Sequence, residues 1–573
     1  MAASPAAIQL PEAFIRPLMI GRLRSLLRGQ RRPPPPPPPL ALDSAIALIN
    51  SGQSAEAIAY LHETIAQHAK STDAWLWLAR AYSGNRQLDD ALEAYDEAVD
   101  LASTPGAAAL IGGERARMRG EREAAVLELT RARELLPSEP EVCNQLGLAL
   151  EAADRQIEAE QVFREGLLLA PISQVLLNNL GALIFRYQGI DAASTFFDEA
   201  LRRRPDDAAL RYNFAVLCGT CGREVRAVSL YREALAIKPD LHSATLNLAL
   251  TLFHLGDLPE AGAVFEARWD IAAALDGAYI FDRAKQWRGE SLAGKAILLW
   301  AEQGLGDTLQ MIRYVPLVVA RGAAAVHVRV PRTMLELFAQ IPGVSSWIAE
   351  DDPVDSSTFD LHCPFMSLPL AFGTTVATIP ATIPYLYATP QRVADWSDRL
   401  PTGAVRARIG LVWSSGQWGN LRYDGQRTEK SLPLAEYAAL ANVPGVCWIS
   451  LQLGAGRDAL AHPPPGLAIF DPATDIHDFA DTAAIVEQLD LVITVDTSVA
   501  HLAGAMGKPV LMLLKSSGGT FWLSERDDSP WYPGSLRIVR QSAAGDWAGA
   551  VARARKLVEA FLEQHSLWDC ETR

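Results

Sequence analysis

Small and large apolar residues recur along residues 41–270 with a period of 34 residues. Alanine stands at seven positions with this spacing, and leucine, tyrosine or phenylalanine follows each alanine four places later. The alanines are Ala57, Ala91, Ala125, Ala159, Ala193, Ala227 and Ala261. Earlier in five units an apolar residue precedes a small one, as in Leu146-Gly147, and proline recurs from Pro137 onwards. Because residues three or four places apart share one face of a helix, the pattern predicts about seven helix–turn–helix units.

A helical hairpin of 34 residues is the tetratricopeptide repeat pattern, and such hairpins stack into an α-solenoid. We expect the small residues to let the two helices of a unit approach closely. The aromatic residues should fill the gap between neighbouring units. The concave surface of a solenoid of this kind binds extended peptides or other proteins, so the repeats predict a protein partner.

One column of side-chain amides runs through the repeats at the same 34-residue spacing, and its members are Gln145, Asn179, Asn213 and Asn247. A carboxamide both donates and accepts hydrogen bonds, which suits the backbone of a bound peptide. The column resembles the asparagine ladder of the protein O-GlcNAc transferases, and we therefore interpret it as acceptor-binding. The alternative is that these amides bond to neighbouring helices of the solenoid itself.

After residue 294 the hydrophobic period changes, and short apolar runs alternate with helical stretches. The runs are Ala296–Trp300, Ala325–Val330, Ile409–Trp413, Val446–Leu451, Leu491–Val495 and Val510–Leu514. Runs rich in Val and Ile that are bounded by Gly, Pro or Asp are typical of buried parallel strands. We predict two α/β units, residues 295–400 and 401–573, which a linker over residues 271–294 joins to the repeats.

Three loops of this half contain candidate site residues. Gly304, Gly306 and Asp307 follow the first strand and open a helix, where backbone N–H groups favour an anion; Asp307 can also act simply as the helix cap. Asp496, Thr497, Ser498 and His501 form a second strand–turn–helix, which suits a diphosphate. The third loop, Asp478–Ala483, leads into a predicted helix over Ala483–Leu489, just before the strand that is followed by Asp496; an acid at a helix start can also be only a cap.

These loops belong to longer segments that carry a family resemblance. The segments are AEQGLGDTLQMIRY (301–314), FDLHCPFMSLP (359–369), IGLVWSSG (409–416), DFADTAAIVEQLDLVITVDTSVAHLAGAMGKPV (478–510) and DDSPWYP (527–533). Together they resemble bacterial tetratricopeptide proteins whose carboxy-terminal half is similar to the heptosyltransferases of glycosyltransferase family 9. In layout the chain resembles the flagellin glycosyltransferases of this group.

The resemblance implies a GT-B fold, in which two Rossmann-like domains bind the acceptor and the nucleotide-sugar donor respectively. It implies an inverting transfer with no metal cofactor and with Asp307 as the catalytic residue. The donor would contact Gly304, Gly306, Lys430, Asp478, Asp496, Thr497, Ser498 and His501. Lys430 stands where many relatives carry arginine, and His362 is a further candidate on the acceptor side.

Composition narrows the class of partner and the compartment. The 573 residues carry a formal net charge of −15, which disfavours a general nucleic-acid binder. Six cysteines are too few for a disulfide framework, and no apolar run reaches the roughly 20 residues needed to span a bilayer. We therefore expect a cytoplasmic protein.

Residues 1–40 differ from the rest, because they contain six arginines, one acidic residue and the prolines Pro33–Pro39. This composition is typical of a disordered spacer. The alternative is a basic amphipathic helix over residues 15–27 that contacts a membrane or a partner.

Three functions fit these observations. The first is transfer of a sugar to a protein, such as flagellin, that the solenoid holds. The second is transfer to an envelope glycolipid or oligosaccharide. The third is a scaffold whose α/β half has lost activity. The repeats favour the first, because a solenoid suits a protein acceptor better than a lipid.

Overall fold

The computed structural model describes residues 42–50, 53–274, 281–403, 405–415, 430–517, 519–524 and 526–564. They divide into two compact units, Met1–Pro205 and Asp206–Arg573. The interpretations of the basic, proline-rich segment 1–40 lie outside the described residues.

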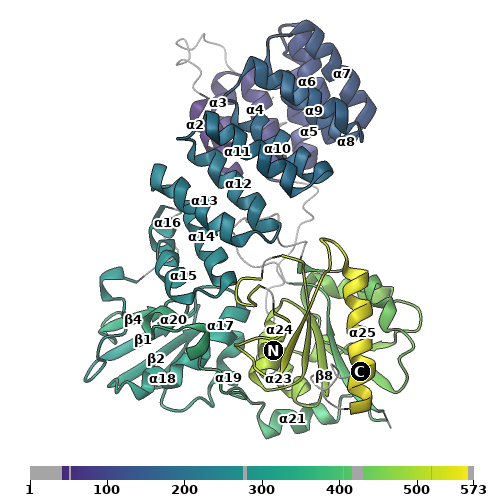
Figure 1. Ribbon diagram of the computed structural model, residues 1–573. Coiled ribbons are helices and arrows are strands. Elements are labelled where there is room, and N and C mark those ends of the chain that lie inside the picture. Colours follow the sequence, from purple (N-terminus) through teal and green to yellow (C-terminus); the bar gives the residue numbers. More distant parts are fainter. Residues whose placement is uncertain are drawn as a thin grey trace, which may run out of the picture. The chain divides into compact units, whose positions relative to one another are not determined.

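The first unit is a series of antiparallel helices (Figure 1). They are α2 (Asp43–Asn50), α3 (Ser54–Gln67), α4 (Thr72–Gly84), α5 (Leu88–Asp100), α6 (Pro105–Met118), α7 (Arg122–Leu135), α8 (Pro140–Ala152), α9 (Gln156–Leu169), α10 (Gln174–Gln188) and α11 (Ile190–Arg203). Consecutive helices pack on one another, and side chains such as Ser71 and Ser173 cap their amino termini. The 34-residue period therefore corresponds to one helical hairpin per repeat.

The small and aromatic positions of a repeat meet within that repeat. A Cβ atom added to Gly147 on α8 would lie 2.5 Å from the Phe163 ring on α9, and one added to Gly181 would lie 2.4 Å from the Phe197 ring. Both rings are buried. The sequence reasoning predicted the close approach correctly, but the aromatic ring fills the gap inside its own hairpin rather than between neighbouring units.

The second unit begins with the remaining repeat helices and continues into the α/β region. These helices are α12 (Ala208–Thr220), α13 (Glu224–Ile237), α14 (His242–Leu255), α15 (Leu258–Phe265) and α16 (Arg268–Ala274). Helix α15 packs on α20 (Leu368–Ala371), and the backbone N–H of Ser524 donates to the carbonyl of His254 at 2.9 Å. The last repeat helices are thus part of the same compact body as the two sheets.

The first sheet is parallel, with strand order β3-β2-β1-β4. Its strands are β1 (Ala296–Trp300), β2 (Ala325–Val330), β3 (Ser346–Ala349) and β4 (Leu361–Pro364). Helices α17 (Leu305–Met311), α18 (Val315–Ala320) and α19 (Leu335–Phe338) lie in the crossovers. Strand β1 is buried along Ile297–Trp300, as expected for a strand covered on both faces.

The second sheet is also parallel, with order β10-β9-β8-β5-β6-β7. Its strands are β5 (Ala407–Val412), β6 (Val446–Ser450), β7 (Ile469–Phe470), β8 (Leu491–Val495), β9 (Val510–Leu514) and β10 (Leu536–Arg540). Helices α23 (Phe479–Glu487) and α24 (Ser498–Ala505) flank β8, and α25 (Trp547–Gln564) packs on β9 and β10 (Figure 1). Two Rossmann-like domains after a helical repeat region are the predicted GT-B arrangement, and this fold class is confirmed.

Four predicted strands have their exact counterparts in β1, β2, β8 and β9, and the other two match β5 and β6 within two residues. The short strands β3, β4, β7 and β10 were not predicted. Strand β4 contains a proline and β7 has two residues, so neither offers a clear hydrophobic run.

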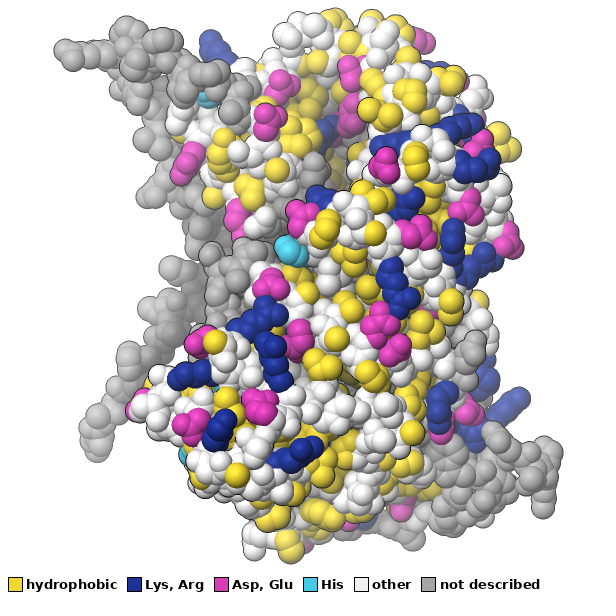
Figure 2. Space-filling view, turned by 60° about the vertical axis from the view of Figure 1, so that its left-hand side comes forward, with side chains coloured by type: hydrophobic (Ala, Val, Ile, Leu, Met, Phe, Trp, Pro, Cys, Tyr) yellow, Lys and Arg dark blue, Asp and Glu magenta, His cyan; other side chains and the backbone are white. Residues whose placement is uncertain are grey.

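No helix of the described residues is long and apolar enough to cross a membrane. On the face shown in Figure 2, basic and acidic side chains are interspersed. Surface ion pairs also occur among the described residues, for example Arg332–Asp351 and Arg392–Glu336. Such exposed pairs contribute little to stability.

Candidate active site

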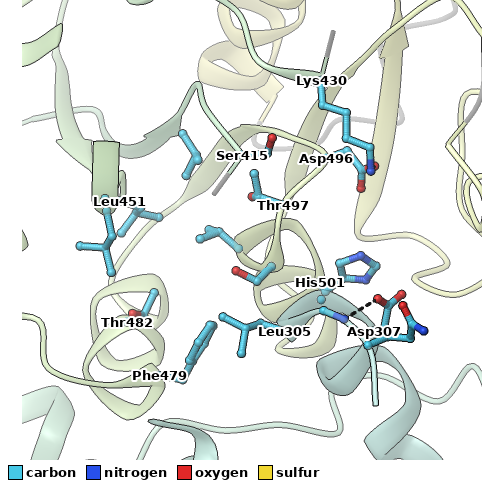
Figure 3. Close-up of a pocket in the computed structure, with 18 of the residues that line it drawn as sticks. Leu305, Asp307, Ser415, Lys430, Leu451, Phe479, Thr482, Asp496, Thr497 and His501 are labelled. Atoms are coloured by element: carbon cyan, nitrogen blue, oxygen red, sulfur yellow. Dashed lines mark hydrogen bonds and ion pairs between the residues drawn. The ribbon is translucent and has the colours of Figure 1, made fainter. Parts of the chain in front are cut away.

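A cavity of about 670 Å³ lies in the second unit, where the loops at the carboxyl ends of the two sheets face each other. Open α/β sheets bind ligands at these strand ends. The first sheet contributes Gln303–Asp307, the second contributes the loops after β5, β6 and β8, and helix α14 contributes Leu250 and Phe253. In Figure 3, Asp307, His501, Lys430 and Asp496 gather at one end, and Leu451, Phe479 and Thr482 line the other.

The first glycine loop positions Asp307 in the first turn of α17. Gly304 is the N-cap residue of this helix, and its N–H donates to Asp307 Oδ2 at 3.1 Å. The carboxylate therefore caps the helix, as the simpler interpretation of the sequence proposed. It also lines the cavity, so capping and a chemical role are compatible.

Burial raises the pKa of Asp307 to about 6. The carboxylates of Asp496 and Glu302 add to the rise, whereas the Lys430 ammonium and the Gly304 N–H oppose it. A carboxylate with a pKa near the working pH is a better proton acceptor than an ordinary aspartate. The local environment is thus suited to general-base chemistry.

Gly306 makes room for His501 of the second domain. A Cβ atom at Gly306 would lie 2.7 Å from His501 Cδ2 and 3.1 Å from Nε2. Helices α17 and α24 pack together at this point. The family resemblance predicts that Gly306 contacts the donor, and the structure adds a packing reason for a glycine at this position.

The second strand–turn–helix places Thr497 and Ser498 at the amino terminus of α24. Thr497 is the N-cap residue in extended conformation, and its hydroxyl is 2.9 Å from that of Thr494. No side-chain cap is bonded to this helix end, and both residues line the cavity. The first N–H groups of the helix and its dipole favour a bound anion at this position.

Lys430 and Asp496 form an ion pair above this helix end, with Nζ 2.7 Å from Oδ2. Burial alone raises the pKa of Asp496, but Lys430, His501 and the indole N–H of Trp522 outweigh it and leave the pKa below its ordinary value. The Trp522 Nε1–H donates to Asp496 Oδ1 at 2.8 Å. Asp496 is therefore charged and fully engaged by protein donors.

His501 lies beside Trp522, with ring centroids 4.8 Å apart, and its Nδ1 is 2.9 Å from the Tyr532 hydroxyl. Burial lowers the pKa of His501 to about 4. The imidazole is thus neutral at pH 7 in the free protein, and an incoming diphosphate would meet a neutral hydrogen-bonding group. Tyr532 fixes the orientation of this ring.

We expect His501→Ala to weaken the binding of a nucleoside diphosphate by about 0.5–1.5 kcal/mol, the typical value of one neutral hydrogen bond. Calorimetric titration with a nucleoside diphosphate measures this change. His462→Ala is the matched control, because His462 is exposed and lies outside the cavity. If the two variants bind the nucleoside diphosphate with equal affinity, His501 does not contact the donor.

Asp478 also lines the cavity, next to Phe479 and Thr482. It is the N-cap of α23, and its Oδ1 accepts from the Asp481 N–H at 2.9 Å. Its other oxygen lies 3.9 Å from Arg392. Helix α23 begins at Phe479, earlier than the predicted start at Ala483, so Asp478 precedes its first turn and lines the cavity.

His362 does not reach the cavity, which corrects its prediction as an acceptor-binding residue. The ring is fully buried on β4, Nδ1 accepts from Trp300 Nε1 at 3.2 Å, and Nε2 is 2.9 Å from the Asp282 carbonyl. Burial lowers the pKa of this imidazole. Its role in the structure is packing against Trp269 and Phe281.

The amide column is bonded within the solenoid at several positions. Asn179 Nδ2 donates to Asn144 Oδ1 at 2.7 Å, and Asn247 Nδ2 donates to the Tyr212 hydroxyl at 3.2 Å. Gln145 is buried and donates to Glu141. These contacts favour the packing alternative for those three residues, whereas Asn213 remains half-buried on α12. A peptide ladder along this column stays a prediction.

Asn179→Ala distinguishes the two interpretations. The change leaves the buried Asn144 oxygen without its donor, so we expect a loss of about 1–3 kcal/mol in unfolding free energy. Urea unfolding measured by circular dichroism checks this value. The control is Gln161→Ala, which removes an exposed amide of α9 and should change little. If the variant is as stable as the wild type but modifies a protein acceptor more slowly, the peptide-binding interpretation of the amide column is supported instead.

Several lining residues were not identified from the sequence. Ser414 and Ser415 follow β5, and their position at a strand end was a usable signal. The Ser415 N–H donates to Ser431 Oγ at 3.0 Å, which holds the segment that carries Lys430 against β5. Trp522 and Leu250 had no local signal, because only the tertiary fold brings them to the cavity.

Two known protein families match this chain, one in the repeat helices and one in the segment that contributes several residues to the cavity. The tetratricopeptide repeat family matches residues 42–108, 188–242 and 226–274. Glycosyltransferase family 9 (heptosyltransferase) matches residues 472–530, which include Asp478, Asp496, Thr497, Ser498 and His501. The chain thus combines tetratricopeptide repeats with a glycosyltransferase family 9 domain, as the sequence resemblance indicated.

Individual proteins are similar to most of the chain or to about half of it. Protein FlbA of Caulobacter vibrioides is 28% identical over 521 residues, which cover 85% of this chain and 84% of that protein. The ADP-heptose LPS heptosyltransferase II of E. coli is 15% identical with a TM-score of 0.37, over 47% of this chain and 99% of its own. A family 9 glycosyl transferase from Veillonella parvula is 12% identical with a TM-score of 0.37, over 48% and 99% respectively.

Proposed function

We propose that the protein transfers a sugar from a nucleoside-diphosphate sugar to a hydroxyl group of a protein acceptor. The observation that carries this proposal is the juxtaposition of Asp307, from the first domain, with the anion-binding end of α24 in the second. The family 9 match over residues 472–530 supports the donor side. The repeats support a protein as acceptor.

Each part of the cavity has a role in this proposal. The diphosphate lies over Thr497 and Ser498, where helix N–H groups and Lys430 balance its charge, so that no metal is needed. The nucleoside occupies the end lined by Leu451 and Phe479. Asp307 accepts the proton of the acceptor hydroxyl as that oxygen attacks the anomeric carbon and the diphosphate leaves. Attack from the opposite side inverts the anomeric configuration.

The layout of the chain, similar to that of flagellin glycosyltransferases, makes flagellin our proposed acceptor. A glycolipid acceptor remains the second candidate from sequence, but no cavity feature favours it. The donor assignment is tested with a panel of nucleotide sugars, by calorimetry and by release of the nucleotide. Binding of one nucleoside-diphosphate sugar, weakened in a Ser498→Tyr variant that fills the helix end, supports the proposal. Binding that this variant leaves unchanged contradicts it.

A further inference from the structure

One wall of the cavity comes from the last repeat. Leu250 and Phe253 lie on α14, and Phe265 lies at the end of α15. The two phenylalanine rings are buried and meet edge to face, with centroids 5.8 Å apart. Leu250 differs from them, because it is 39% exposed although it lines the cavity. It is therefore an apolar side chain that lines the cavity and is still accessible to solvent.

This wall adjoins the charged end of the cavity. The Phe253 ring contacts the Phe521 ring, with centroids 5.0 Å apart. The next residue, Trp522, donates to Asp496 and stacks near His501. These contacts connect the wall to the charged residues where the proposed chemistry occurs.

Leu250 is also close to the amide column on the same helix. Asn247 precedes it by three residues, and residues at this spacing are neighbours on a helix surface. Asn247 is half-buried and is held by the Tyr212 hydroxyl. A chain that passes Asn247 would thus meet a polar group first and an apolar side chain next, which suits a polypeptide better than a hydrocarbon chain.

We propose that Leu250, supported by Phe253 and Phe265, forms an acceptor subsite for an apolar side chain of a polypeptide, next to the residue that receives the sugar. This inference rests on the proposed function and specifies its acceptor. Contact with Leu250 removes apolar surface of both partners from water and places the neighbouring hydroxyl near Asp307. The last repeat then determines acceptor specificity directly, within the active site.

The test compares Leu250→Ser with Leu255→Ser on the same helix. Leu255 is 37% exposed and lies outside the cavity lining, so it is a matched control. The probe is flagellin purified from cells that lack the enzyme. We expect Leu250→Ser to lower transfer to flagellin about fivefold or more while release of nucleotide from the donor in the absence of acceptor stays unchanged. Leu255→Ser should change neither rate, and Leu250→Met should restore transfer.

A second measurement isolates the contact. Flagellin in which the apolar neighbour of the modified residue is replaced by serine should lose as much transfer as the Leu250 variant. The two losses should not multiply when combined, because both remove the same contact. If Leu250→Ser transfers sugar at the wild-type rate, or if the two losses multiply, the proposed subsite is wrong. Neither result contradicts the proposed function. A wild-type enzyme that releases nucleotide but modifies no flagellin instead contradicts the acceptor of the proposed function, and the subsite with it.

Discussion

Asp307→Asn should reduce turnover by about 10²–10⁴-fold, the usual contribution of a positioned general base. Asparagine keeps the shape of the side chain and can still accept the Gly304 N–H bond at the start of α17. The loss should therefore appear in kcat, while the affinity for the donor nucleotide stays within about twofold. Transfer measured under single-turnover conditions, together with calorimetry of nucleotide binding, separates the two quantities.

The control for this variant is Asp257→Asn at the amino terminus of α15. Asp257 also caps its helix, but as the N-cap residue, whose Oδ1 accepts from the Glu260 N–H, and it lies outside the cavity. Its replacement should leave turnover unchanged. Near-normal turnover in both variants would make Asp307 a helix cap only. Glu302 is a poor substitute as a base, because Arg268 and the Met366 N–H hold its carboxylate.

Lys430→Met should have the second largest effect, and it should act on both binding and pH dependence. Loss of a charge-assisted contact to the diphosphate should weaken nucleotide binding by about tenfold to a hundredfold. In the free enzyme, burial raises the pKa of Asp307 to about 6 although the Lys430 ammonium opposes the rise. Without this ammonium the pKa should rise further.

The direction in which activity changes with pH depends on which protonation state of Asp307 acts as the base. Only the carboxylate accepts a proton, so activity falls as the pH decreases through the pKa of Asp307. In the wild type, the acidic limb of kcat/KM should lie near pH 6, since this ratio reports the free enzyme. In Lys430→Met the limb should move to higher pH, and in Lys430→Arg it should return towards the wild-type position. Lys508→Met, which removes a lysine outside the cavity, is the control. If the acidic limb of Lys430→Met is unchanged, the Lys430 ammonium does not lower the pKa of Asp307, and this prediction is wrong.

The parts of the site that could be predicted from sequence are local. Asp307 and the Thr497–His501 segment each follow a strand and begin a helix, so a few neighbouring residues define their geometry. The repeats were predictable for a similar reason, because the period of small and aromatic residues reports contacts within one hairpin, as Gly147 and Phe163 show.

The parts that could not be predicted depend on contacts between distant segments. Gly306 lies against His501, which is far from it in sequence, and this explains the glycine better than ligand access alone. His362 is a polar residue in a sequence segment with family resemblance, yet its ring is buried among Trp269, Phe281 and Trp300. In the sequence, Leu250 does not differ from other apolar residues of the repeats. Only its position in the lining of the cavity distinguishes it from them.

In the proposed function, this protein glycosylates a protein acceptor and Asp307 acts as the base. The most direct measurement is the intact mass of flagellin after incubation with the enzyme and the nucleotide sugar that binds it. We expect the mass of flagellin to increase by one or more sugar residues with the wild-type enzyme, and by almost nothing in the same time with Asp307→Asn. An unchanged flagellin mass with wild-type enzyme that binds and cleaves the donor, or an equal increase with Asp307→Asn, would contradict it.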